Sequence, residues 1–420
     1  MPPYNVGPSC PQAYRMEHAA RNEAVFAGSR VCLHLIASLD PKWGGPQEGL
    51  KQLTAAALRV GQRLEVASLD PPDSPWRADY PCPVHLLGPG RLGKYGYAPA
   101  MLPWLQDNSG RISVIVVHGL WQYHGMAAWR LWRRTGTPYF VYTHGMLDPW
   151  FKRTYPLKHL KKSLYWPWAE YRVLRDAQRV LFTCEAERTL ARQSFARYRA
   201  NESVVGFGIP RPPGNPQAQR AAFLARFPEL HGQRLLLFLG RIHPKKGCDL
   251  LVEAFARAAA RDPRLQLVLA GPDQQGTSRA LAERIERLGV AQRVTWTGML
   301  SGDLKWGAFH AAEAFALPSH QENFGIAVVE ALACGLPVLI STRINIWQEI
   351  VAGGAGIAAA DTLAGTHTLL DQWFALSAVE RRAMAQRAAE CFRRHFMIDA
   401  AALNLDAVIA GARCAPAWLH

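Results

Sequence analysis

The residues most informative about chemistry lie between positions 318 and 341, in the run PSHQENFGIAVVEALACGLPVLIS. An apolar helix is predicted to begin at Phe324 and Gly325 and to end at Gly335. The free N–H groups at such a helix start carry about half a positive charge and attract phosphate oxygens. Glu330 falls in the second turn among apolar residues, where an unpaired carboxylate is costly. The run therefore predicts an anion seat at Gly325 and a carboxylate suited to accept hydrogen bonds from a ribose diol.

A second group of residues, in the run FLGRIHPKKGCDLL, places cations at the end of a predicted strand. Gly240 and Arg241 follow the strand, and Lys246 comes just before a helix. Ligands of open α/β sheets bind at the carboxyl ends of strands, where two cations can neutralise a diphosphate. Of the adjacent Lys245 and Lys246, only one is expected to face the ligand. The alternative interpretation is that these cations are solvated surface charges.

Three further side chains are candidates for contact with a ligand. Glu322 lies in the polar turn before the helix, where a ligand would approach, although a plain loop position is the alternative. His144, in YTHG, and His118, in VVHGLW, follow two predicted strands. A histidine at a strand end is often structural, so His144 is a candidate for either role, and His118 is expected to line the wall of the cleft.

The elements that must position these residues alternate between short apolar strands and helices. The alternation starts at Val31, stops at the Pro- and Gly-rich segment 206–217 and resumes at residue 234. Such alternation is typical of parallel sheets with right-handed crossovers. The sequence therefore predicts an α/β protein built from two Rossmann-like halves, with the ligand site in the cleft between them.

Five segments follow from this pattern. A helical stretch from about residue 378 has no strand after it, so its last part is a candidate to cross back to the first domain. The predicted segments are a leader at 1–28, an N-terminal domain at 29–209, a linker at 210–217, a C-terminal domain at 218–395 and a C-terminal helix at 396–420.

The amino-acid composition limits the classes of protein to which the chain can belong. Apolar residues make up 49% and charged residues 19% of the 420, which excludes a disordered chain. A net charge of +15 favours anionic partners. The first thirty residues lack the apolar core of a secretory signal, and no run of about 18 apolar residues occurs, so membrane contact is expected to be peripheral.

One segment, residues 150–175, carries seven Lys or Arg against one Glu, interleaved with aromatic residues. Such a segment can lie on an anionic membrane. Alternatively, it is a solvated helix whose aromatic residues pack in the core, or a nucleic-acid-binding patch, although no nucleic-acid module accompanies it. The predicted membrane contacts are Trp150, Lys152, Arg153, Lys158, Lys161, Lys162 and Trp166.

Taken together, GR-x-x-P-x-K-G and PS-x-x-ENFG-x-x-x-x-EA-x-A-x-G-x-PV resemble the donor-binding half of the family 4 glycosyltransferases, which are retaining enzymes of the GT-B fold. The resemblance covers most of residues 230–357. It is looser in the N-terminal half, where a Gly-Gly loop and His144 stand where the family has them. It implies two Rossmann-like domains whose parallel sheets face each other across a deep cleft.

The resemblance also implies roles. Arg241 and Lys246 would clamp the diphosphate of a sugar nucleotide, Glu330 would hold the ribose, and His144 would sit against the transferred sugar. The implied catalytic set is His144, Glu322, Arg241 and Lys246. The implied donor-binding set is Gly44, Gly45, Gly240, Arg241, Lys246, Met299, Glu322, Asn323, Phe324, Gly325 and Glu330.

The implied activity is transfer of a hexose-type sugar from a GDP-, UDP- or ADP-sugar to an oligosaccharide acceptor, lipid-linked, with retention of configuration. Surface polysaccharide assembly, of exopolysaccharide or lipopolysaccharide, on the cytoplasmic face of the plasma membrane is the expected setting. No cofactor, metal or nucleic acid is expected: the sequence has no Asp-x-Asp, so Arg241, Lys246 and a helix start would replace a metal.

Other classes remain as alternatives to sugar transfer. The same architecture serves sugar-nucleotide epimerases, hydrolases and phosphorylases, although no feature identifies a lysine for pyridoxal phosphate. A non-catalytic basic protein that binds membranes or nucleic acid is another. The run GPGRLGKY at 88–95 nearly spells a P-loop, but Tyr95 stands where Ser or Thr should reach magnesium, so a nucleotide triphosphatase is rejected.

Overall fold

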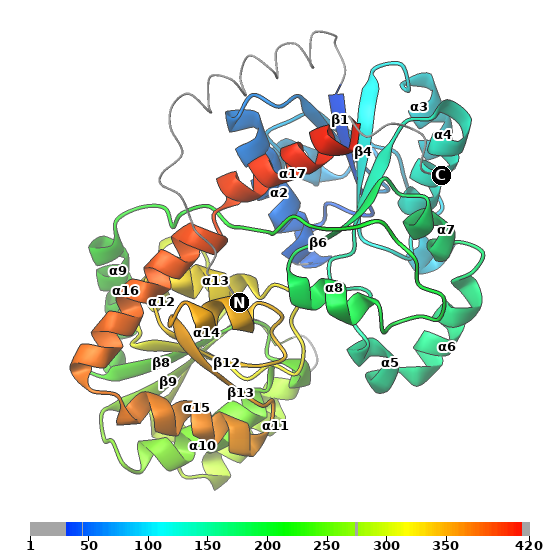
Figure 1. The fold of residues 1–420 in the computed structure, drawn as a ribbon. Helices are drawn as coiled ribbons and strands as arrows, with labels where there is room; N and C mark the ends of the chain where they lie inside the picture. Colours follow the sequence, from blue (N-terminus) through cyan, green and yellow to red (C-terminus); the bar gives the residue numbers. More distant parts are fainter. Residues whose placement is uncertain (1–30, 44, 274–275, 414–420) are drawn as a thin grey trace, which may run out of the picture.

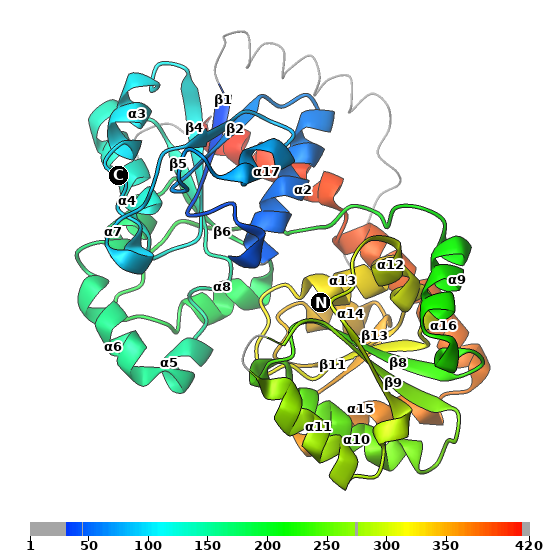
Figure 2. The same cartoon turned by 180° about the vertical axis from the view of Figure 1, so that it is seen from behind.

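The computed structural model describes residues 31–43, 45–273 and 276–413 as two α/β domains, one above the other in Figure 1. Figure 2 gives the opposite view, with the N-terminal domain again above and the C-terminal domain below. The predicted leader, Gly44 and the last seven residues lie outside the described ranges.

The N-terminal domain is built on a seven-stranded sheet in the order β3-β2-β1-β4-β5-β6-β7, with all neighbours parallel. Helices cover both faces of the sheet, and the inner strands are therefore almost continuously apolar. The strands are β1 (Val31–Ile36), β2 (Leu64–Ser68), β3 (Val84–Leu86), β4 (Ile112–His118), β5 (Tyr139–Tyr142), β6 (Arg179–Phe182) and β7 (Glu202–Val204).

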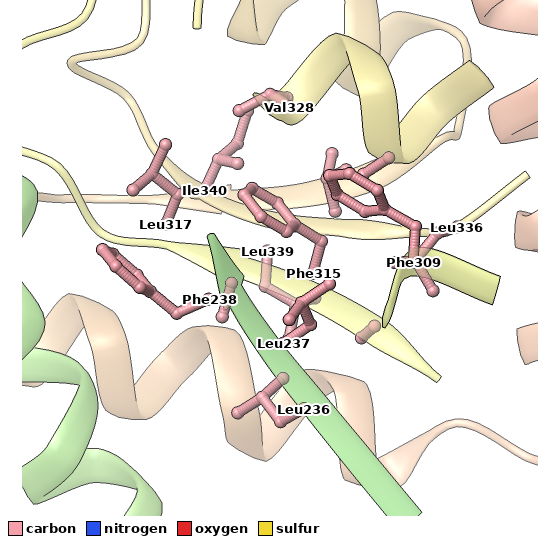
Figure 3. Packing of buried hydrophobic residues seen from close by; sticks show 14 of the residues in the cluster. Leu236, Leu237, Phe238, Phe309, Phe315, Leu317, Val328, Leu336, Leu339 and Ile340 are labelled. Atoms are coloured by element: carbon pink, nitrogen blue, oxygen red, sulfur yellow. The ribbon is translucent and has the colours of Figure 1, made fainter. Parts of the chain in front are cut away.

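The C-terminal domain has a six-stranded parallel sheet in the order β10-β9-β8-β11-β12-β13. Figure 3 shows its core, in which Phe238, Phe315 and Leu339 of the central strands pack with Val328 of α13. The strands are β8 (Arg234–Leu239), β9 (Leu265–Ala270), β10 (Val294–Gly298), β11 (Ala314–Leu317), β12 (Val338–Ser341) and β13 (Gly356–Ala359).

Within each sheet, helices or short turns connect successive strands, as right-handed crossovers require, and α15, α16 and α17 follow the last strand. Those of the N-terminal domain are α2 (Gly45–Arg59), α3 (Met101–Asp107), α4 (Tyr123–Thr135), α5 (Trp150–Thr154), α6 (Pro156–Tyr165), α7 (Glu170–Arg175) and α8 (Glu185–Ala191). Those that follow are α9 (Pro216–Arg226), α10 (Cys248–Ala259), α11 (Thr277–Arg287), α12 (Gly302–Ala311), α13 (Ile326–Ala333), α14 (Trp347–Ala352), α15 (Leu363–Ala375), α16 (Ala378–His395) and α17 (Ile398–Arg413). Short 3-10 turns occur at Pro41–Trp43, Pro75–Asp79, Gly93–Tyr95, Pro228–Leu230, Pro244–Lys246 and Ala291–Arg293.

The last helix, α17, crosses back to the N-terminal domain and lies against α2 (Figure 1). Its apolar face, including Leu405, is buried in one cluster with Leu53 of α2 and Phe140 of β5. Arg59 and Asp399 form an ion pair at 2.6 Å between the same two helices. The predicted pair of Rossmann-like domains and the predicted crossover are therefore both present, and the domains are joined by two chain segments.

Candidate functional site

A cavity of about 470 Å³ lies between the two domains. Its wall comes from both halves of the chain, and it contains most of the residues that the sequence singled out. They are Gly45, His144, Gly240, Arg241, Lys246, Glu322, Asn323, Phe324, Gly325 and Glu330. The structure thus brings together residues that are up to about 285 positions apart in the chain.

Two helix starts meet at this cavity. Helix α2 begins at Gly45 and α13 begins after Gly325, and both glycines line the cavity. A Cβ on Gly45 would lie 3.3 Å from Cδ1 of Ile326, so the helices approach closely at their N-terminal ends. Gly325 has φ of 71°, a left-handed conformation that favours glycine. The unpaired N–H groups and the helix dipoles of both ends attract negative charge to one point.

Cations of the C-terminal domain border the same space. Lys246 follows β8 in a 3-10 turn and forms an ion pair with Glu322. Burial acts to raise the pKa of Glu322, but Lys246 and Lys245 together hold that pKa below its usual value. Lys245 also lines the cavity, with its ammonium 5.5 Å from the ring centroid of Trp150. The expectation that only one of the two lysines faces the cleft is therefore wrong.

The position of Lys246 depends on the glycine that follows it. Gly247 has φ of 69°, and a Cβ there would lie 2.3 Å from the carbonyl oxygen of Pro318. Glycine therefore lets the turn after β8 pack against the segment after β11, where two strand ends meet.

Glu330 is 8% exposed and forms an ion pair at 2.8 Å with Lys305 of α12. Burial raises the pKa of Glu330, and Lys305 opposes that effect. The bond uses Oε1, and among the described residues the other oxygen has no hydrogen-bond partner. The buried carboxylate thus has the partner that its burial requires and retains an acceptor for a ligand. Sequence reasoning missed Lys305, because a single lysine on a helix gives no signal of its pairing.

The turn that presents His144 is held by a buried carboxylate. His144 has φ of 47° and follows β5. Glu187, also buried, accepts hydrogen bonds from Thr143 Oγ1 and from the backbone N of Gly145, both at 2.6 Å. Glu187 also accepts two hydrogen bonds of 2.7 Å from Thr183, one from its backbone N and one from its Oγ1. Sequence reasoning did not find Glu187, which reads as an ordinary first-turn residue of α8.

Behind His144 lies a row of histidine rings. The Nδ1 atom of His118 is 3.1 Å from His144 Nε2, and the His118 Nε2 atom is 2.9 Å from His34 Nδ1. His118 is 3% exposed and does not line the cavity. The expectation that His118 forms the cleft wall is therefore wrong: it supports His144 from behind. Burial lowers the pKa of His144 to about 4, so its ring is neutral at neutral pH.

Polar contacts between the domains close one side of the cavity. Gln321 Nε2 donates to Asp148 Oδ2 at 3.0 Å, and Asn323 Nδ2 donates to Thr183 Oγ1 at 3.1 Å. The two amides belong to the segment before α13, and their acceptors belong to the N-terminal domain. The segment that holds the anion seat is therefore tied to the turn that holds His144.

One residue implied by the resemblance, Met299, is not brought to the cavity. Met299 is 76% exposed and does not belong to the cavity wall. Gly44 lies outside the described residues. The P-loop-like run ends in a single 3-10 turn, Gly93–Tyr95, followed by Gly96 with a left-handed conformation, and no α-helix begins there. That geometry agrees with the rejection of a nucleotide triphosphatase.

The basic aromatic segment, residues 150–175, forms α5, α6 and α7. Trp166 is 4% exposed and stacks on Phe195 at 4.5 Å, so it cannot contact a membrane, and Trp150 and Lys162 are partly buried. The other four predicted contacts, Lys152, Arg153, Lys158 and Lys161, are exposed. The same segment has four exposed apolar residues that were not predicted as membrane contacts: Leu157, Leu160, Leu164 and Trp168.

The described residues contain neither a membrane-spanning helix nor a cluster of metal-binding side chains. None of the helices there is long and apolar enough to span a bilayer. In the same part of the chain, no group of three or more His, Cys, Asp or Glu side chains is arranged to hold a metal ion.

Comparison with known proteins gives the same picture as the geometry. The family "Glycosyl transferases group 1" matches residues 220–389, and "Glycosyl transferase 4-like domain" matches residues 44–208. A D-inositol 3-phosphate glycosyltransferase of Mycobacterium marinum is 33% identical over 49% of this chain and 42% of its own length. The chain spans about half the length of the curated relatives it matches.

Solved structures share the fold. HepE of Anabaena, crystallised with UDP and glucose, has a TM-score of 0.71 and 18% identity over 91% of this chain and 99% of its own. WaaG, a glycosyltransferase involved in lipopolysaccharide biosynthesis, has a TM-score of 0.63 and 16% identity over 90% of this chain and 99% of its own. With two matched family regions that together span both domains, the chain belongs to the family 4 glycosyltransferases of the GT-B fold.

Proposed function

We propose that the protein transfers a hexose-type sugar from a nucleotide-diphosphate sugar to an oligosaccharide acceptor. The observation that carries the proposal is the convergence of two helix starts, Arg241 and Lys246 on one cavity. Breaking a glycosyl–phosphate bond leaves negative charge on the diphosphate and positive charge on the sugar. Fixed dipoles and cations that face the leaving group stabilise that charge in the transition state. Arg241, Lys246 and the helix starts then take the part that a metal plays elsewhere, and no cofactor is required.

The remaining residues of the cavity bind different parts of the donor in this proposal. Glu330, with an oxygen left over from Lys305, accepts from the ribose hydroxyls. Glu322 and the backbone from Asn323 to Gly325 face the donor sugar, and His144 faces it from the opposite domain. The ring of His144 is neutral, so it acts as a hydrogen-bonding group and not as a counter-charge. We include retention of anomeric configuration in the proposal, and NMR of the anomeric proton in the first product would test it.

A thermal-shift screen with UDP-, GDP- and ADP-sugars tests the donor. Selective binding raises the melting temperature, because a ligand that binds only the folded state stabilises it. HepE, a fold relative, was crystallised with UDP and glucose, so the uridine series comes first. Arg241→Met should abolish the shift. If no nucleotide sugar stabilises the protein, or if the variant responds like the native chain, the proposed donor site is wrong.

The acceptor is proposed to be lipid-linked, with the protein on the inner face of the plasma membrane in surface polysaccharide assembly. Leu157, Leu160 and Leu164 recur on α6 at helical spacing and are exposed beside Lys161. An apolar stripe flanked by cations is the pattern of a helix that lies in an anionic interface.

Flotation with anionic vesicles tests the membrane part. Leu160→Gln combined with Leu164→Gln should prevent binding, whereas Leu403→Gln, an exposed leucine of α17, should leave it unchanged. The curated relatives are named for D-inositol 3-phosphate, so a phosphorylated small molecule is a second acceptor class. Transfer to such a molecule without vesicles would favour it over the lipid.

A further inference from the structure

A second, smaller pocket opens beside the donor cavity. Its volume is about 60 Å³, and it shares Met146 and Phe151 with the larger cavity. The rest of its wall comes from the N-terminal domain and includes Lys158, His159 and Lys162 on α6. The wall common to both cavities means that a group held here lies next to the donor.

Within the part of the chain that the structure describes, the two lysines of this pocket form no ion pair and contact aromatic rings instead. Lys162 holds its ammonium 4.4 Å from the ring centroid of Trp121, and Lys158 holds its ammonium 4.5 Å from that of Tyr155. Among the described residues, no carboxylate lies within ion-pair distance of either. Burial lowers the pKa of Lys162, and the nearby Glu170 opposes that effect. An anion that enters beside Lys162 would favour its charged form further.

Two carboxyl groups lie near the lysines without forming an ion pair with them. Asp148 lines the pocket, but its Oδ1 accepts from the backbone N of Trp150 at 2.8 Å and its Oδ2 accepts from Gln321 at 3.0 Å. Glu170 accepts from the backbone N of Trp121 at 2.8 Å, and burial raises its pKa to about 7. Near neutral pH, Glu170 is therefore only partly charged.

We infer that this pocket binds a phosphate or diphosphate group carried by the acceptor. The inference rests on the proposed function, because it needs a donor in the adjacent cavity. Lys158, which is exposed, and Lys162, which is half-buried, are one helical turn apart and line the pocket, and Leu157, Leu160 and Leu164 are exposed on the same helix. Helix α6 thus presents cations to the site and an apolar edge to the outside. Two sources share the required chemistry: a free phosphorylated sugar or cyclitol, and the head group of a lipid.

The test uses inorganic phosphate as the probe and the full chain with saturating UDP, which occupies the donor cavity. Phosphate binding is followed by isothermal titration calorimetry. Lys162→Met and Lys158→Met each retain the aliphatic stem and remove the charge. Each should weaken phosphate binding about tenfold and leave UDP binding unchanged. Lys161→Met is the matched control, because Lys161 is exposed on the same helix and does not line the pocket.

The outcomes separate the inference from the proposed function. Absence of phosphate binding to the UDP-saturated chain overturns the inference, as does equal weakening by Lys161→Met, which would indicate diffuse surface charge. Failure of UDP to bind the native chain overturns the proposed donor instead. Melting temperatures of the variants without ligand establish that each is folded.

Two further probes distinguish the sources of the phosphate. D-inositol 3-phosphate represents the free form, and farnesyl diphosphate represents the lipid form. If the lipid is the source, Leu160→Gln should weaken farnesyl diphosphate binding alone. If the source is a free phosphorylated molecule, D-inositol 3-phosphate should bind with the same Lys162 dependence and Leu160→Gln should have no effect.

Discussion

His118 lies directly behind His144, with its Nδ1 atom 3.1 Å from the Nε2 atom of His144, and its other ring nitrogen bonds to His34. Each neutral imidazole has one N–H and one acceptor nitrogen, so the two hydrogen bonds must run in the same direction along the row. The protonation of His118 therefore determines whether the free nitrogen of His144 donates or accepts. His118 acts on the cavity through His144, as a positioning residue.

The first prediction concerns His118. His118→Leu should lower kcat about tenfold or more and leave the affinity for the donor nearly unchanged, because the ring of His144 loses its orientation and its fixed tautomer. His118→Asn, whose amide can replace the Nδ1 contact, should recover part of the rate. The measurement is kcat and KM for all three proteins, with 15N NMR of the His144 ring. An unchanged tautomer in His118→Leu would contradict the assigned role.

The histidine row also predicts a pH dependence of stability. Burial lowers the pKa of both His34 and His144 to about 4, against about 6.5 in the unfolded chain. The unfolded state therefore binds protons below pH 6.5 that the folded state takes up only near pH 4. The free energy of unfolding should be unaffected by these rings above pH 6.5 and should fall between pH 6.5 and 4, by up to about 3 kcal/mol for each ring.

Urea unfolding across that range measures the effect. His34→Asn does not titrate and keeps a hydrogen bond to His118, so it should lose less stability than the native chain on acidification. Equal slopes for the two proteins would show that His34 is protonated in the folded state at pH 6.

The third prediction concerns the buried pair of Lys305 and Glu330. Lys305→Met leaves a carboxylate that is 8% exposed without its partner, so it should lower the free energy of unfolding by about 1 to 3 kcal/mol. Adding Glu330→Leu should recover much of that loss, because the uncompensated charge is gone. Donor affinity should stay low in the double variant if Glu330 holds the ribose. Chemical denaturation and thermal shift with the donor give the two readouts.

Much of the fold follows from local patterns. The strands predicted ahead of His118 and of Gly240 are present as β4 and β8, although β4 includes His118 itself. The edge strands β3 and β7 were not predicted, because each has only three residues, too few to give a periodic signal. The edge strand β13 was not predicted because its sequence, GIAA, is mostly glycine and alanine, which are depleted in strands.

The donor side of the site was predictable, because Arg241, Lys246 and the start of α13 each follow a strand of one sheet. The residues that hold this side of the site in place were not predictable. Glu187 and Lys305 act through partners about 40 and 25 residues away, and single sequences contain no record of such pairing. Trp166 was assigned to the surface because aromatic residues between lysines suggest an interface, whereas packing against Phe195 decides its place.

The fourth prediction concerns the cations of the donor site. Arg241→Met should lower kcat/KM by a factor equivalent to about 3 kcal/mol, the usual cost of losing one preorganised group at the leaving charge. Lys246→Met should cost a similar amount and also leave Glu322 with one cation fewer. Kinetics with the donor found by thermal shift provide the measurement. Arg279 is an exposed arginine of α11, so Arg279→Met is the control and should leave kcat/KM unchanged.

The fifth prediction concerns closure of the domains at Gly145. A Cβ at this position would lie 2.7 Å from the Cβ of Asn323 in the opposite domain, and Gly145 also has φ of 73°. Gly145→Ala should therefore push the two sides apart and strain the turn that holds His144. Because the reacting groups come from both domains, we expect kcat to fall about a hundredfold, with weaker donor binding. Asn323→Ala in the same background should restore little activity, since the strain at φ remains.

Small-angle scattering with and without UDP would detect the opening of the domains. The native chain should stay compact in both conditions, and Gly145→Ala should have a larger radius of gyration. An unaltered radius together with full activity would show that the contact between Gly145 and Asn323 is not needed for the reaction.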